Sequence, residues 1–252
     1  MSDAFPVRTL GGPTALFEYG GLRLLTDPTF DQPGSYTSPS GNTLTKLAPP
    51  AATPDSLGPI DVVLLSHDQH ADNLDDSGRA LLADIPLTLT TVSGAERLGG
   101  AARGLAPWES VQVGAVTITG VPARHGPVGC EPMTGEVTGF VLTGDGLPSV
   151  YVSGDNAALE LVEQIAERFG PIDTALLFAG AVRTPLFDGA LLTLDSEQAA
   201  EAARILGAKR IVLVHFDSWA HFTEGRDALV KAFTAAGLID RVQLDRPGRD
   251  ED

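Results

Sequence analysis

The 252-residue sequence has a single cysteine, Cys130, and no apolar run as long as a membrane span. One cysteine excludes an intramolecular disulfide and is compatible with a reducing compartment. A membrane-spanning helix needs roughly 20 apolar residues, and the first stretch, MSDAFPVRTL, carries no apolar signal core. These absences predict a cytoplasmic protein.

Basic residues are also scarce: 17 lysines and arginines stand against 33 aspartates and glutamates, for a net charge of −16. Such a surface repels phosphate backbones and anionic membranes unless one face concentrates its cations, and the sequence has no basic run. We therefore expect neither a nucleic-acid nor a membrane partner. With 43% hydrophobic and 20% charged residues, the chain is expected to fold around a full core.

Apolar runs rich in Val, Ile and Leu predict strands at residues 14–19, 22–26, 62–66, 116–122, 139–143, 149–153, 174–178 and 211–216. Helical periodicity predicts helices at residues 75–85, 94–104, 156–170, 195–207 and 224–237. Asp195 and Gln198 are spaced as in a capping box. We expect sheets with helices packed outside, in one domain over residues 1–252.

Residues 31–59 are rich in Pro, Ser, Thr and Gly, a composition that argues against regular structure. A loop of this length in a compact domain is usually functional or disordered. We expect it to form a lid that selects substrate. The tail, residues 246–252, is expected to be frayed.

Several predicted strands end on aspartate or histidine: Asp27, His67, His125, Asp155 and His215. Ligands bind at the carboxyl ends of strands in sheets flanked by helices, so these residues are expected to converge. The chain's five histidines, which include His70 and His221, all lie at strand ends or just beyond.

Imidazoles and carboxylates together are ligands for zinc, manganese or iron, and the lack of a cysteine pair argues against a structural thiolate zinc site. Two ions a few Å apart would need roughly six protein ligands. The predicted ligands are His67, His70, Asp72, His125, Asp155 and His215.

Each of these residues also has a simpler interpretation. Asp27 would begin an Asp-Pro turn, and Asp155, Asp72 and Asn73 would cap the helices that follow them. Arg124 and Arg183 would either hold a substrate anion or lie solvated at the surface. Trp219 would either wall the pocket or pack in the core.

These motifs, in this order, resemble the metallo-β-lactamase fold hydrolases, most closely the branch that includes the ascorbate phosphate lactonase. The stretches that carry the resemblance are GGLRLLTDPTFD, VVLLSHDQHADNLD, VPARHG, YVSGDN and RIVLVHFDSWAHF. Together they extend from about Leu10 to Phe222.

The resemblance implies an α+β fold, a four-layer αββα sandwich of two mixed β-sheets with helices on the outer faces and a metal site along one edge. It implies that His125 and His215 are ligands from separate halves, that Asp155 bridges two ions, and that Asp27 orients a ligand histidine by accepting its second N–H. A metal-bound water, its pKa lowered towards ~7, would attack a carbonyl or phosphoryl centre.

One motif departs from the family pattern His-x-His-x-Asp-His. The chain has His67-Asp68-Gln69-His70-Ala71-Asp72-Asn73. Without a gap, Gln69 falls on the second histidine and Asp72 on the last. With one inserted residue, His70 becomes the second histidine and Asn73 falls on the last, and we favour this register because it keeps the following NLD aligned.

Either register lacks one imidazole, which weakens one of two metal sites because Asn and Gln are poor ligands for zinc. The outcomes are a single well-held ion, a two-ion site that prefers manganese, or loss of the metal. We predict a hydrolase with one or two divalent ions, zinc, manganese or iron, acting on a small cytoplasmic lactone, phosphoester or amide.

Asp72 and His221 are the expected catalytic residues, His221 as a substrate contact or proton donor. Asp27, Asn73, Arg183 and Trp219 are expected to support the ligands or contact the substrate. A homo-oligomer is compatible with the sequence. The alternative is a non-catalytic binding or scaffold protein whose metal site is degraded at Gln69 or Asn73.

Overall fold

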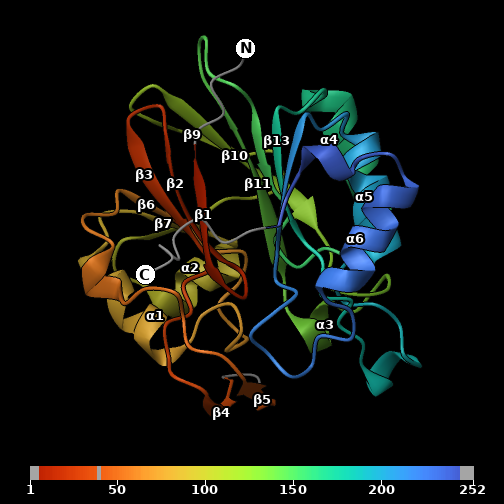
Figure 1. Ribbon diagram of the computed structural model, residues 1–252. Coiled ribbons are helices and arrows are strands. Elements are labelled where there is room, and N and C mark those ends of the chain that lie inside the picture. The colour runs from red at the N-terminus through yellow and green to blue at the C-terminus, as the bar shows by residue number, and fades with distance from the viewer. Residues whose placement is uncertain (1–5, 39–40, 245–252) are drawn as a thin grey trace, which may run out of the picture.

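The computed structural model describes residues 6–38 and 41–244, in which two β-sheets pack face to face (Figure 1). The first sheet has the order β1-β2-β3-β6-β7-β8 and the second the order β15-β14-β13-β12-β11-β10-β9. The strands of the first are β1 (Val7–Gly11), β2 (Thr14–Tyr19), β3 (Leu22–Thr26), β6 (Val62–Leu64), β7 (Thr88–Thr90) and β8 (Ala102–Gly104). Those of the second are β9 (Ser110–Val113), β10 (Val116–Ala123), β11 (Val137–Thr143), β12 (Val150–Val152), β13 (Thr174–Phe178), β14 (Arg210–Val214) and β15 (Val242–Gln243).

Both sheets are mixed. Strands β1, β2 and β3 are antiparallel, whereas β3, β6, β7 and β8 are parallel. In the second sheet β9 to β12 are antiparallel and β12 to β15 are parallel. This arrangement confirms the predicted pair of mixed sheets.

Helices cover the outer face of each sheet (Figure 1). Helices α1 (Asp76–Leu81) and α2 (Val92–Leu98) lie on the first sheet, and α4 (Leu159–Phe169), α5 (Ser196–Ile205) and α6 (Arg226–Ala235) on the second. The short helix α3 (Glu131–Thr134) lies near one end of the sandwich, and 3-10 turns cover Pro54–Ser56, Leu82–Asp84, Pro185–Phe187 and Ile239–Arg241. Within the described residues, every helix is too short or too polar to cross a membrane. The four layers are those of the predicted sandwich.

The alternation of side chains along β14 shows how the layers are held together. Val212 and Val214 pack between the sheets, whereas Ile211 and Leu213 pack under the helices. Successive strand residues point to opposite faces, and a strand buried on both faces reads as one continuous apolar run. Burial of each such side chain stabilises the fold by roughly 1.5–3 kcal/mol. Because β14 is buried on both faces, it stands out in the sequence as an apolar run.

The helix predicted at residues 94–104 is correct in its first half and wrong in its second. Helix α2 ends at Leu98, and the residues after Gly99 and Gly100 form strand β8, which pairs with β7. Both glycines have positive φ, +64° and +59°, a conformation that ends a right-handed helix. The short strands β1, β7, β9 and β15 were also not predicted.

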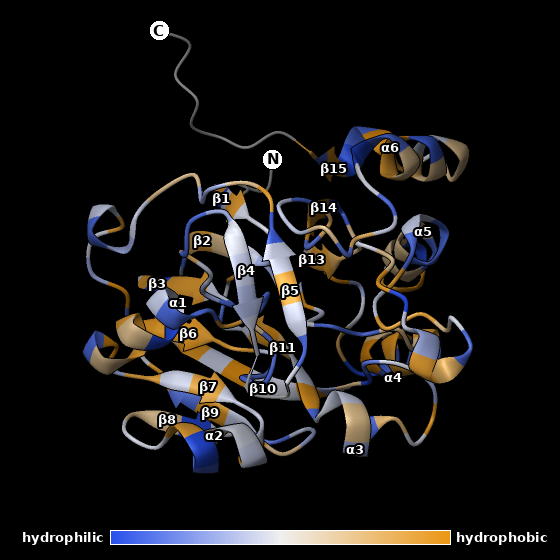
Figure 2. Ribbon diagram, turned by 90° about the horizontal axis from the view of Figure 1, so that it is seen from below, coloured by the Kyte–Doolittle hydropathy of each residue, from blue (hydrophilic) through white to orange (hydrophobic). Residues whose placement is uncertain are grey.

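The prediction that residues 31–59 lack regular structure is wrong. Strands β4 (Gly34–Thr37) and β5 (Thr43–Lys46) form an antiparallel hairpin. Its cross-strand contacts are between exposed hydroxyls, Ser35 with Thr45 and Thr37 with Thr43, so no apolar alternation marks the strands. Figure 2 shows the hairpin lying across the end of the two sheets. The tail predicted to fray, residues 246–252, lies outside the described residues.

Strand direction brings the predicted site residues to one end of the sandwich. Strands β3 and β6 are parallel, as are β12, β13 and β14, and β10 runs in the same direction as β12 because β11 is antiparallel to both. The carboxyl ends of strands that run in one direction meet at one edge of a sheet. Asp27 and His67 leave one edge of the first sheet, and His125, Asp155 and His215 leave one edge of the second. The two edges lie at the same end of the sandwich, because His67 groups with His125 and Asp155.

Candidate metal centre

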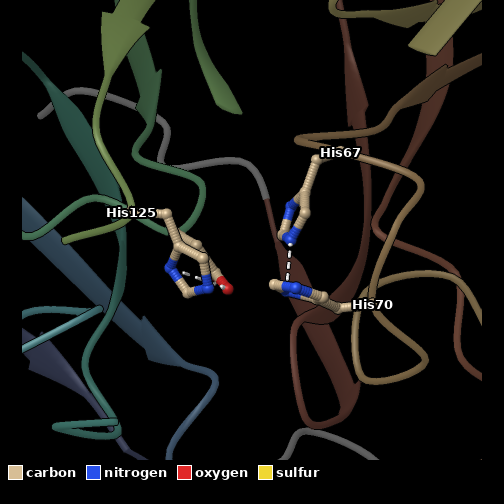
Figure 3. Close-up of side chains that lie close together, drawn as sticks. His67, His70 and His125 are labelled. Carbon is tan, nitrogen blue, oxygen red and sulfur yellow. Dashed lines mark hydrogen bonds and ion pairs between the residues drawn. The ribbon is translucent and has the colours of Figure 1, made fainter. Parts of the chain in front are cut away.

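Four buried side chains form the first part of the site, which we call the three-histidine cluster: His67, His70, His125 and Asp155. One ligand atom from each lies within 4.8 Å of the others. The imidazoles come from both sheets and face a common space (Figure 3). His67 Nε2 lies 2.9 Å from His70 Nδ1, and the ring centres of His67 and His125 are 5.4 Å apart. This set of three imidazoles and a carboxylate is typical of a zinc, manganese or iron site.

Three further side chains form the second part, the Asp72 cluster: Asp72, Asp155 and His215. His215 Nε2 lies 3.2 Å from Asp72 Oδ2, and His215 Nδ1 lies 3.4 Å from Asp155 Oδ1. Asp155 belongs to both clusters, as the predicted bridging carboxylate requires. Asp72 Oδ1 and Asp155 Oδ2 are buried without a hydrogen-bond partner among the described residues. Buried carboxylate oxygens in this state fit a missing cation.

The backbone is unusual where it presents these ligands. Asp27 and His215 have positive φ, +28° and +58°, which costs energy in non-glycine residues and is often found at functional sites. Gly154 has φ +59°, and a Cβ there would lie 2.7 Å from Thr138 O and 2.8 Å from Ser66 Cβ. Only glycine lets the turn that carries Asp155 approach the turn that carries His67.

A hydrogen-bonded chain orients His67. Asp27 accepts from the Ser66 amide at 2.6 Å and from the Ser66 hydroxyl at 2.7 Å, and that hydroxyl lies 3.0 Å from His67 Nδ1. When Asp27 is ionised, the Ser66 proton goes to Asp27, and the hydroxyl accepts from His67 Nδ1–H. The tautomer leaves His67 Nε2 free to bind an ion. Asp27 therefore acts through Ser66 rather than by the direct contact expected, and Ser66 is a site residue that sequence reasoning missed.

His125 is oriented by the main chain. Its Nδ1 lies 2.8 Å from Leu192 O, and a carbonyl can only accept. Nδ1 therefore carries the proton and Nε2 is available to an ion. Asp68, within the histidine motif, is also fixed: Arg97 donates to its carboxylate from both Nε and Nη2, and Arg79 donates to its carbonyl. No pattern in the sequence links Leu192 or Arg97 to the site.

The residues that precede helices α1 and α4 are not the ones proposed as caps from the sequence. Asp75 caps α1 by accepting from Gly78 N, and Ala158 is the residue before α4. Asp72, Asn73 and Asp155 are therefore not helix caps, which removes the simpler interpretation of each. Asp195 caps α5 as predicted by accepting from Gln198 N.

Burial and neighbouring charges set the protonation of the ligands. Burial lowers the pKa of His70 to about 4 and holds that of His67 well below its ordinary value. Burial alone would raise the pKa of Asp72, but the His221 and His215 imidazoles bring it well below its ordinary value. His67 and His70 are therefore neutral and Asp72 is ionised, the forms that bind a metal ion, whereas at His215 burial is outweighed by the Asp155 and Asp72 carboxylates, which raise its pKa.

A cavity of about 240 Å³ opens onto both clusters. Its wall includes His70, Asp72, His125 and His221 together with the apolar side chains Leu44, Met133, Val182, Leu186 and Leu192. Asn42, Thr43 and Leu44 come from the β4–β5 hairpin, so the segment predicted to form a lid does border the cavity.

The other predicted substrate contacts differ in position. Arg183 lines the cavity, donates to Gly189 O at 3.0 Å and lies 3.8 Å from Asp195 Oδ2. Arg124 is paired with Glu160 and is not among the lining residues. Trp219 is also not among them, since its buried ring contacts Tyr36 and the Lys46 ammonium under the hairpin.

A family model described as the β-lactamase superfamily domain matches residues 22–216. The chain belongs to the metallo-β-lactamase superfamily. A metal-dependent hydrolase from Methanosphaerula palustris is 31% identical over 179 residues, covering 68% of this chain and 75% of that protein. A metal-dependent hydrolase from Pyrococcus furiosus is 26% identical over 215 residues, covering 84% of each chain.

Solved structures share the superfamily fold. A "possible metal-dependent hydrolase" from Veillonella parvula superposes with a TM-score of 0.83 at 18% identity and covers 98% of each chain. An isothiocyanate hydrolase from Delia radicum gut bacteria gives 0.78 at 19% identity and covers 94% of each chain. This protein is thus a member of a superfamily of metal-dependent hydrolases. Its placement in the ascorbate phosphate lactonase branch stays a prediction.

The structure also bears on the register of the superfamily's histidine motif in this chain. His70 lies in the three-histidine cluster, whereas Gln69 packs at Gly135, where a Cβ would lie 1.9 Å from Gln69 Oε1. Asn73 Nδ2 donates to Asp27 Oδ2 at 3.2 Å and to Asp155 Oδ1 at 3.3 Å. This placement favours the register with an inserted residue, with Asn73 at the last histidine of the motif.

Proposed function

We propose that the three-histidine cluster binds a divalent ion, zinc, manganese or iron, and that the protein hydrolyses a small cytoplasmic substrate at a carbonyl or phosphoryl centre. The observation that carries this proposal is the convergence of three imidazoles, two of them oriented by hydrogen bonds, with a buried carboxylate that has a free oxygen. A divalent ion bound there would lower the pKa of a water ligand and polarise the bond under attack. The location and a homo-oligomeric state stay predictions from the sequence.

The residues of this chain prepare the site for that chemistry. The Asp27–Ser66 pair and Leu192 O fix the tautomers of His67 and His125, so that their free nitrogens need no rearrangement before binding. Asp155 joins the two clusters because its Oδ2 lies 3.7 Å from His125 Nδ1 and its Oδ1 lies 3.4 Å from His215 Nδ1. Asp72, at the cavity wall, would be the carboxylate nearest a bound substrate.

The cavity favours an uncharged substrate with an apolar group. Five of its lining side chains are aliphatic or thioether, and among the lining residues Arg183 is the one cationic side chain. The positive charge of that guanidinium is partly offset by the Asp195 carboxylate, 3.8 Å away, which weakens its attraction for a phosphate. We therefore favour a lactone, ester, amide or related carbon electrophile over a phosphoester. Isothiocyanates belong in the same screen, because one structural neighbour is named as an isothiocyanate hydrolase.

Metal content and activity test the proposal together. Protein purified without chelator should contain a transition metal in stoichiometric amount, and a metal-supplemented screen of lactones, esters, amides, isothiocyanates and phosphodiesters should find turnover of an apolar member. His125→Ala and Asp155→Ala should each reduce metal occupancy and lower turnover at least ~100-fold. Asp145→Ala, in an exposed turn at the other end of the second sheet, is the control and should do neither.

Wild-type protein without transition metal, and with no gain in activity when zinc, manganese or iron is added, would instead favour the non-catalytic binding protein. Normal metal content and turnover in both ligand variants would show that the site is elsewhere.

A further inference from the structure

The Asp72 cluster offers one protein ligand fewer than the three-histidine cluster. Asn73 stands where the superfamily motif carries its last histidine, and its amide nitrogen donates to Asp27 and Asp155. An amide N–H is a donor and cannot coordinate a cation. A second ion in the Asp72 cluster would therefore lack an imidazole unless another part of the chain supplies one.

His221 lies at the open side of this cluster. Its Nε2 is 2.9 Å from Asp72 Oδ2, the oxygen that also lies 3.2 Å from His215 Nε2. Ligand atoms that are each ~2.0–2.2 Å from one ion lie about 3 Å from one another. His221 also lines the cavity with Asp72, and its Nδ1 is buried without a hydrogen-bond partner among the described residues. It is the one histidine of the chain outside both clusters.

The segment after β14 holds His221 in this position. Phe222 packs against both imidazoles, with its ring centre 4.6 Å from that of His215 and 4.6 Å from that of His221. Trp219 forms a β-bridge with Lys46 at the base of the hairpin. His215 and His221 are thus presented as a pair on one supported turn, six residues apart.

We propose that His221 supplies the imidazole that Asn73 does not, so that Asp72, Asp155, His215 and His221 hold a second divalent ion. This inference rests on the proposed function, in which the three-histidine cluster holds the first. His221 Nε2 and His215 Nε2 lie 2.9 and 3.2 Å from the same Asp72 oxygen, so in this proposal His221 is a ligand rather than the predicted proton donor. The missing histidine of the motif would then be replaced from a distant point in the sequence.

The test is the metal stoichiometry of four proteins: wild type, His221→Ala, Asn73→His, and the double variant. Each is equilibrated with excess zinc or manganese, freed of unbound ion and measured by elemental analysis. We expect about two ions per chain in the wild type and in Asn73→His, and about one in His221→Ala. The double variant should bind two again, because the new histidine at position 73 restores the lost ligand. Met133→Ala, which changes the cavity wall but no ligand, should bind two.

Two ions in His221→Ala, with only turnover reduced, would overturn the inference and support a proton donor. One ion in the wild type that His221→Ala retains would also overturn it, while leaving the proposed function intact. No ion in the wild type would overturn the proposed function itself and this inference with it. Recovery of the second ion in the double variant excludes misfolding as the cause of its loss in His221→Ala.

Discussion

The ion pair between Lys46 and Asp75 fixes the base of the β4–β5 hairpin and gives a sharp prediction of stability. Lys46 Nζ lies 3.1 Å from Asp75 Oδ2, and the two side chains are only 2% and 0% exposed. Asp75 also accepts from the amides of Asp31 at 2.7 Å and Gly78 at 2.8 Å. The pair thus joins the hairpin, the first turn of α1 and the segment that follows β3.

Replacing Lys46 with Met leaves the Asp75 carboxylate buried without its cation. Removal of one partner from a buried pair costs about 3–5 kcal/mol, and the two retained amide bonds place the expected loss near the lower limit, about 3 kcal/mol. For a chain of this size that loss corresponds to a fall in Tm of about 6–12 °C. In Lys46→Met with Asp75→Asn the buried charge is gone and the asparagine oxygen can still cap α1 by accepting from Gly78 N. Its NH2 group cannot accept from the Asp31 amide as Asp75 Oδ2 does, so stability should return to within about 2 kcal/mol of the wild type.

Urea unfolding, followed by circular dichroism in the presence of EDTA, measures these free energies without a contribution from bound metal. Lys209→Met is the control, because Lys209 Nζ lies 2.6 Å from Asp173 Oδ1 but its side chain is 63% exposed, and loss of such a pair should cost less than about 1 kcal/mol. The reasoning is refuted if Lys46→Met costs no more than Lys209→Met, or if the double variant is less stable than Lys46→Met alone.

Two further predictions concern the site. Burial raises the pKa of Asp27 to about 7, so in metal-free protein the stability due to its protonated form is complete below the unfolded pKa near 4 and is lost as the pH rises through 7. The free energy of unfolding of the wild type, relative to that of Asp27→Asn, should therefore fall by up to about 4 kcal/mol across this window. A difference that does not depend on pH in urea titrations would contradict this prediction. Leu44, on the hairpin, lines the cavity, so Leu44→Ala should raise the KM of an apolar substrate about 10-fold with little change in kcat. Leu47 is exposed, so the control Leu47→Ala should change neither constant. Equal KM values for the two variants in steady-state kinetics would exclude the hairpin from substrate selection.

Much of the fold could be read from the sequence because it depends on side-chain burial along single strands. β13 and β14 are buried on both faces and therefore appear as the apolar runs TALLF and IVLV. The hairpin β4–β5 and the strand β9 have exposed, polar faces, so the same signal is absent from them. Strand β8 was predicted as helix because Ala102 and Arg103 favour helices. It is a strand because it pairs with β7, a tertiary contact that the local sequence does not show.

The sequence alone determined which residue types stand at the strand ends, and hence that His67, His125, Asp155 and His215 are candidates for one site. Their order and spacing are local properties, as are the periodicities of the buried elements. Only the tertiary structure decided that His70 rather than Gln69 faces these residues, that Ser66 lies between Asp27 and His67, and that His221 meets Asp72. Those contacts join segments up to 149 residues apart, and which atoms meet across such a separation depends on how the two sheets pack, which no local pattern encodes.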